Sequence, residues 1–135
     1  MGEKMSKNVT FDKSEDFALR IIKLYEFLIA RKKEYTISKQ ILRSGASVGA
    51  NLAEAVYGVS DNDFVHKNTI SRKECAETLY WLRLLEKSKL ITKTQFGSIY
   101  SDGCEIMKML TSTIKTMQIK IKRDETKKQK KISNS

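Results

Sequence analysis

Between Phe96 and Ile121, apolar residues recur at alternating intervals of four and three. This heptad period is typical of α-helices that pack side by side and supercoil around one another. Gly103 is the only weak position in the row. The row consists of Phe96, Tyr100, Gly103, Met107, Leu110, Ile114, Met117 and Ile121. A chain with such a seam has to bury it against other helices, so helical packing is the first expectation.

Three earlier segments supply those partners. Residues 12–31, 36–57 and 60–87 each place apolar side chains at helical spacing, and the chain contains no proline. The pairs Asp12 with Glu15 and Ser60 with Asp63 resemble N-terminal capping boxes, and Gly58 is expected to end the second helix in a left-handed conformation. Short connections favour antiparallel neighbours. The sequence therefore predicts an all-α protein, an up-down-up-down four-helix bundle.

The length of 135 residues suits one domain. We expect residues 1–11 to form a disordered N-terminal segment, residues 12–119 the bundle, and residues 120–135 a basic, disordered C-terminal tail. No apolar run approaches the roughly 18 residues of a membrane span, and the first residues, MGEKMSKNVT, lack the apolar stretch of a secretory signal. These features predict a cytoplasmic protein with no membrane partner.

The net charge of +10 is unevenly distributed. The tail contributes +5, since seven basic residues there face only Asp124 and Glu125. One interpretation is a solvated end that keeps the protein soluble. The other is electrostatic contact with RNA, DNA or another polyanion. The candidate contacts are Lys120, Lys122, Arg123, Lys127, Lys128, Lys130 and Lys131.

The stretch RSGASVGANLAEA, which begins at Arg43, places several small residues inside a predicted helix. On a helical wheel they form one strip with almost no side-chain volume, which lets another helix approach closely. The strip consists of Gly45, Ala46, Gly49, Ala50 and Ala53. Two interpretations stay open: tight packing within one bundle, or an additional contact with a neighbouring protomer. The apolar breadth of the third segment, which carries Ile70 and Trp81 beside its core row, favours self-association.

A polar column runs along the same predicted helix. It contains Arg43, Asn51 and Glu54, and the third segment carries Glu74 and Glu77 among apolar residues. Because a carboxylate near an interface needs a charged or hydrogen-bonding partner, we expect these five residues to form a network that fixes the register of helices or protomers.

Catalytic chemistry has little support in the sequence, and no cofactor is expected. His66 is the only histidine, whereas a di-metal bundle needs two Glu-x-x-His units. Cys75 and Cys104 lack metal-ligand spacing, and no glycine-rich phosphate loop occurs. The prediction is a protein that is not an enzyme, with a metal-dependent bundle enzyme as a remote alternative.

The succession of ILRSGASVGANLAEA and DNDFVHKNTISRKECAETLYWLRLLEKSKLI resembles the small bacterial four-helix bundle family encoded in 23S rRNA intervening sequences, sometimes labelled ribosomal proteins. The specific parts are Arg43, Asn51 and Glu54 in one segment, and Ser71, Glu74, Glu77 and Leu82 in the next. The family usually reads Asn-Ile-Ala-Glu-Gly where this chain reads NLAEA from Asn51 to Ala55.

This resemblance implies a bundle that assembles as a ring, typically a homopentamer. It also implies a relation to the accessory variability protein of diversity-generating retroelements, a basic pentamer that binds reverse transcriptase and nucleic acid. No catalytic residue carries over. The predicted function is thus a non-enzymatic oligomeric bundle that binds RNA or a nucleoprotein through basic surfaces. The alternative is a protein-binding adaptor or assembly module without a nucleic-acid role.

Overall fold

The computed structural model describes residues 8–134 and contains four α-helices over that range. They are α2 (Val9–Lys32), α3 (Ile37–Ala55), α4 (Asp61–Lys87) and α5 (Lys93–Ser133). No strand occurs among the described residues. Each helix packs against the next one in the chain, and α2 also contacts α5. The predicted all-α, up-down four-helix bundle is therefore confirmed.

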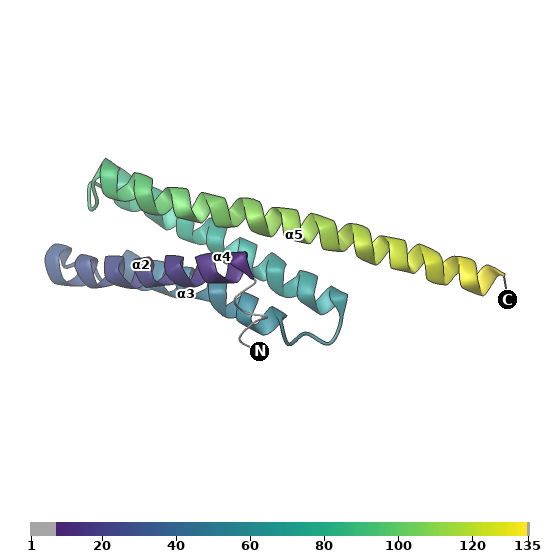
Figure 1. Ribbon diagram of the computed structural model, residues 1–135. Coiled ribbons are helices and arrows are strands. Elements are labelled where there is room, and N and C mark those ends of the chain that lie inside the picture. Colours follow the sequence, from purple (N-terminus) through teal and green to yellow (C-terminus); the bar gives the residue numbers. More distant parts are fainter. Residues whose placement is uncertain (1–7, 135) are drawn as a thin grey trace.

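The four helices differ in length, and this gives the molecule two unlike ends. Figure 1 shows the α2–α3 turn and the α4–α5 turn together at one end, while α5 runs past the other three helices at the opposite end. We call the end that holds the two turns the tip, defined as residues 31–39 and 86–93. The part of α5 from Ile119 to Ser133 is called the extension.

Side-chain caps fix the starts of three helices. Ser60 Oγ accepts the backbone N–H of Asp63 at 3.1 Å, which confirms the predicted cap of α4. At α5, Thr92 and Gln95 form a reciprocal capping box. The prediction for α2 was wrong by one turn, because the cap is Asn8, whose Oδ1 accepts the backbone N–H of Phe11 at 3.0 Å. The helix therefore begins at Val9, inside the segment that we expected to be disordered.

The start of α3 is capped from the preceding turn. The carboxylate of Glu34 accepts the backbone N–H groups of Thr36, Ile37 and Ser38 at 2.7–2.8 Å. Burial opposes ionisation of this carboxyl, but the three N–H donors outweigh it, so the pKa of Glu34 lies below its usual value. Glu34 thus satisfies the free N–H groups at the start of α3.

The helix ends differ from the prediction. Gly58 does not adopt a left-handed conformation. Left-handed backbone occurs instead at Lys33 (φ 53°), the C-cap of α2, and at Lys89 (φ 64°), in the turn between α4 and α5. Both lie at the tip, and both are positions at which glycine is the usual residue.

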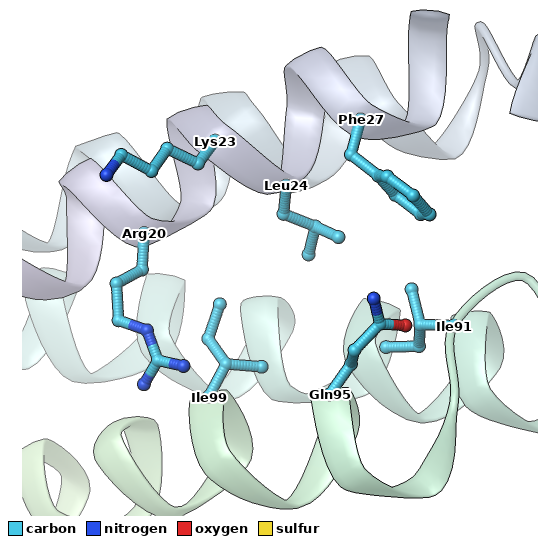
Figure 2. Close-up of a pocket in the computed structure, with 7 residues that line it drawn as sticks. All are labelled: Arg20, Lys23, Leu24, Phe27, Ile91, Gln95 and Ile99. Carbon is cyan, nitrogen blue, oxygen red and sulfur yellow. The ribbon is translucent and has the colours of Figure 1, made fainter. Parts of the chain in front are cut away.

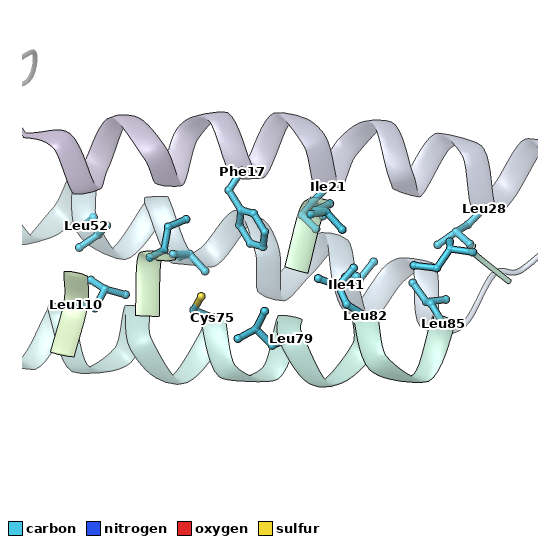
Figure 3. Close-up of a cluster of buried hydrophobic side chains, with 14 residues drawn as sticks. Phe17, Ile21, Leu28, Ile41, Leu52, Cys75, Leu79, Leu82, Leu85 and Leu110 are labelled. Carbon is cyan, nitrogen blue, oxygen red and sulfur yellow. The ribbon is translucent and has the colours of Figure 1, made fainter. Parts of the chain in front are cut away.

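The core is one apolar cluster to which all four helices contribute, and Figure 3 shows its side chains pointing into the space that the helices enclose. On α4, Ser71, Cys75, Thr78, Leu82 and Leu85 are buried, whereas Phe64 is only half-buried. The seam predicted for α5 needs correction. Its fully buried row is Ile99, Gly103, Ile106, Leu110 and Ile114. Tyr100 and Met107 lie half-buried at the edge, because α5 is rotated to turn the two isoleucines inward.

Polar groups inside the bundle bond across helix pairs. Ser71 Oγ donates to the carbonyl of Val48 at 2.7 Å, and Thr78 Oγ1 donates to Ser44 Oγ at 2.8 Å, which ties α4 to α3. The thiol of Cys75 contacts the carbonyl of Gly103, and its burial raises its pKa to about 12. Such a thiol is an unreactive core group.

Two glycines of α3 determine how closely α2 approaches. A Cβ built on Gly45 would lie 2.9 Å from Cγ2 of Ile21, and one on Gly49 would lie 3.0 Å from Oγ of Ser14. Ile21 and Ser14 are fully buried, so neither side chain can move into solvent. The small residues at these two positions thus serve packing inside one bundle.

This packing predicts that alanine has opposite effects on stability at two glycines, Gly45 and Gly97. Gly45→Ala should lower the free energy of unfolding by up to about 2 kcal/mol, because an overpacking cost of roughly 1–3 kcal/mol is offset by a gain of only about 1 kcal/mol in helix propensity. Gly97→Ala in α5, where an added Cβ meets no atom within 4 Å, should instead stabilise the protein by up to about 1 kcal/mol. Urea unfolding measures both changes. A stabilising Gly45→Ala would show that α2 and α3 are not in close contact.

Candidate nucleic-acid interface

The basic segment that we predicted to be a disordered tail continues α5 as helix to Ser133. No glycine or proline interrupts the chain between Gly103 and Ser133, and Lys, Arg, Glu and Gln are good helix formers. The last fully buried residue of α5 is Ile114. The extension is therefore a solvated helix that continues from a packed one, without a core of its own.

Helical geometry separates the basic residues of the extension into two sides. Positions that recur at intervals of three and four residues lie on one side of a helix, at about 100° per residue. Most of the cations follow that spacing and form what we call the ridge: Lys120, Arg123, Lys127, Lys130 and Lys131. Lys128 flanks the ridge, and Lys122 points to another side. The seven predicted residues therefore do not form one surface.

The cations of the ridge are available to a partner. All seven basic residues from Lys120 to Lys131 are exposed, and among the described residues only Lys120 has an ion-pair partner. Its Nζ lies 2.8 Å from the carboxylate of Asp61 at the start of α4, a hydrogen bond that raises the pKa of Lys120. That contact holds the base of the extension against the bundle and leaves the cations beyond it unpaired.

The predicted polar network forms only in part. Arg43 pairs with Glu74 at 3.2 Å and also with Glu77, which in turn accepts the indole N–H of Trp81 at 3.0 Å. The arrangement links α3 to α4 at the surface of the bundle, since the Arg43 side chain is 48% exposed.

The other two predicted members of the network lie outside it. Asn51 Nδ2 donates to the carbonyl of Ser47, one turn earlier in the same helix. Glu54 pairs with Lys67 of α4. Within one chain the five residues therefore do not form a single network, because Arg43, Asn51 and Glu54 reach different partners. A network between protomers stays a prediction.

The predicted interface residues also divide into two groups. Gly45 and Gly49 contact α2 inside the bundle, as described above. Ala46 and Ala50 are exposed, whereas Ala53, Ile70 and Trp81 are half-buried. Ile22, which follows Ile21 on α2, is 38% exposed. The alanines next to the glycines thus expose two small apolar side chains on the outside of α3.

The seam between α2 and α5 is held by ion pairs that sequence reasoning missed. Arg20 donates to Asp102 and to Ser98, and Lys13 lies 2.8 Å from Glu105. These partners are about 80–90 residues apart, so no local pattern marks them. Only the packing of α2 against α5 brings them together.

An open groove of about 300 Å³ lies along the same seam. Figure 2 shows Leu24 and Phe27 of α2 facing Ile99 and Gln95 of α5 across it. The groove offers apolar contact but no pair of close ionisable groups for acid–base chemistry, because the charge of Arg20 is already paired with Asp102.

Residues 8–134 contain no cluster of three His, Cys, Asp or Glu side chains that could hold a metal ion, and His66 is exposed. Within the same range, no helix is both long enough and apolar enough to cross a bilayer.

Comparison with known proteins agrees with this architecture. The family model of the 23S rRNA-intervening sequence protein matches residues 6–112. The chain belongs to this family. A crystal structure of a protein of unknown function from the S23 ribosomal protein family of Bacteroides thetaiotaomicron is 51% identical and superposes with a TM-score of 0.79. The alignment covers 79% of this chain and 99% of that one. The search of curated proteins returned no match.

The family match ends before the candidate interface. It stops at Ser112, so the end of the packed part of α5 and the entire extension lie beyond it. Membership of the 23S rRNA-intervening sequence family therefore accounts for the bundle but not for the ridge. The relation to the retroelement accessory protein stays a prediction.

Proposed function

We propose that this protein is a non-enzymatic, self-associating helical bundle that binds structured RNA, free or within a nucleoprotein, through the ridge of α5. The observation that carries the proposal is a row of exposed cations on a helix that extends beyond the packed bundle, of which only Lys120 has an ion-pair partner among the described residues. Phosphate groups are the partners that such a row attracts most strongly, because neutralising them releases condensed counterions.

The chemistry of the ridge supports a polyanionic partner. Arg123, Lys127 and Lys131 follow one another at intervals of four residues, and like charges at that spacing destabilise a helix by a few tenths of a kcal/mol per pair. Phosphates bound along the ridge would remove this repulsion. RNA binding and helicity of the extension should therefore reinforce each other.

The alternative is a protein-binding adaptor whose positive charge serves solubility only. It predicts no dependence of RNA affinity on the ridge. The exposed side chains of Ala46 and Ala50 on α3 support the self-associating part of the proposal, since small side chains allow another helix of a second copy to approach closely.

Salt-titrated binding to a structured RNA tests the ridge. The triple variant Arg123→Gln, Lys127→Gln, Lys131→Gln should weaken binding and reduce the slope of log K against log salt by roughly 2–3, because each lost phosphate contact reduces it by about one. The matched control is Lys108→Gln, Lys115→Gln, Lys122→Gln. It removes the same charge from another side of α5 and should keep a slope close to that of the wild type.

Equal losses in the two triple variants would show that net charge and not the ridge governs binding. Absence of binding by the wild type at low salt would contradict the proposal altogether. Circular dichroism of each variant confirms that the helices are retained.

Sedimentation analysis tests self-association. The wild type should sediment as a multiple of the 15.5 kDa chain, as a pentamer if the resemblance holds. Ala50→Arg should reduce the mass of the assembly, because the arginine places a long charged side chain beside Ala46 on the outside of α3. The same substitution at Ala76, an exposed alanine of α4, should not. A monomeric wild type would contradict self-association.

A further inference from the structure

The net charge of the chain resides at the two ends of the molecule. Residues 120–135 contain seven basic and two acidic residues, and the tip also contains seven basic and two acidic residues. Each region therefore has a charge of +5, and together they account for the total of +10. The remainder of the chain has twelve basic and twelve acidic residues and is neutral. The tip is thus as basic as the C-terminal segment.

The charges of the tip are accessible and unpaired. Its basic residues are Arg31, Lys32, Lys33, Lys39, Lys87, Lys89 and Lys93, all exposed. None of them forms an ion pair with another described residue. Of the two acids, Glu34 directs its carboxylate to the backbone of α3. Figure 1 places both turns of the tip at the end of the bundle that lies away from the C-terminus.

Helix stability explains only some of these cations. Arg31, Lys32 and Lys87 lie in the last turns of α2 and α4, where positive charge interacts favourably with the helix dipole. The dipole therefore accounts for three of the seven, without any binding role.

The other four cations occupy positions where local chemistry disfavours them. Lys33 and Lys89 adopt left-handed backbone, which costs a residue with a Cβ of the order of 1 kcal/mol and is usually left to glycine. Lys39 and Lys93 lie in the first turns of α3 and α5, where the dipole is repulsive to cations. Neither of those first turns contains an acidic residue. Residues that break a local rule in this way are expected at functional sites.

The surface of the tip is hollowed where three of its cations meet. Lys87, Lys89 and Lys93 line an open depression of about 450 Å³, together with Glu86 and the cap residue Thr92. Groups of this kind can contact more than one phosphate of a folded nucleic acid, since lysine acts as a mobile point charge on a long stem.

From these observations we infer that the tip is a second RNA-binding surface, separate from the ridge, that contacts phosphate groups through Lys33, Lys39, Lys89 and Lys93. This inference rests on the proposed function, because it assumes that structured RNA is the partner. One molecule then presents phosphate-binding cations at both ends of a neutral bundle.

The left-handed lysines allow a test in which binding and stability change in opposite directions. The double variant Lys33→Gly, Lys89→Gly removes two cations and also relieves the backbone strain. Its Tm should stay the same or rise by roughly 2–6 °C, because glycine is favoured at both positions. Its affinity for a structured RNA at low salt should fall by roughly tenfold. The slope of log K against log salt should become shallower by about two, because two phosphate contacts are lost.

A second variant and a control separate local charge from net charge. Lys39→Gln with Lys93→Gln removes two cations of the tip without changing left-handed backbone, and it should weaken binding to a similar extent. Lys73→Gln with Lys108→Gln removes the same charge from exposed positions on the neutral part of α4 and α5 and should bind like the wild type.

The outcomes distinguish this inference from the proposed function. Weaker binding by both tip variants, with the control unchanged, supports the second surface. Wild-type affinity in both tip variants, while the ridge variant binds weakly, overturns the second surface and leaves the ridge in place. Equal losses in the tip variants and the control would also overturn it, because net charge would then suffice. A wild type that binds no RNA would contradict both the proposed function and the second surface.

Discussion

The contact of Gly45 with Ile21 determines how the bundle is built. Because no side chain separates the backbone of α3 from this buried isoleucine, α2 lies close enough to α3 for Ser14 to reach Gly49 one turn further along. The apolar face of α3 is then free to meet α4, where Ser71 and Thr78 bond to groups of α3. A larger residue at position 45 would separate α2 from the seam on which the remaining core packs.

The rigid bundle also determines where charge can accumulate. Its flanks, residues 8–30, 40–85 and 94–119, carry ten basic and eleven acidic residues. Several of these pair across helices, as Arg43 does with Glu74 and Lys67 with Glu54. The net positive charge remains at the tip and in the C-terminal segment. A neutral bundle with two basic ends can contact phosphates over a length greater than either end alone provides. Long-range attraction would also raise the rate of encounter with RNA, in a manner that salt suppresses.

The sequence predicted the helices well because their signals are local. Apolar periodicity gave four helices, and the cap at Ser60 followed from its pairing with Asp63, three residues on. Features that depend on tertiary packing were missed or misplaced. The rotation of α5, which buries Ile99 and Ile106 in place of Tyr100 and Met107, depends on how neighbouring helices fit together.

The candidate site was predictable to a similar degree. Composition revealed the basic C-terminal segment, but its helicity depends on continuation from a packed helix, which composition does not show. The tip was missed because its cations come from two turns about 55 residues apart in the sequence, and only the antiparallel arrangement unites them. Arg31 and Lys32 taken alone are explained by the helix dipole.

Lysine-reactivity footprinting by mass spectrometry, with the protein free and bound to a structured RNA, tests most directly whether the two ends contact RNA. The account predicts that RNA protects Lys127 and Lys131 on the extension and Lys33 and Lys89 at the tip from acetylation. Lys73, on the neutral part of the bundle, should react at the same rate in both states. Protection of Lys73 together with unchanged reactivity at both ends would contradict the account.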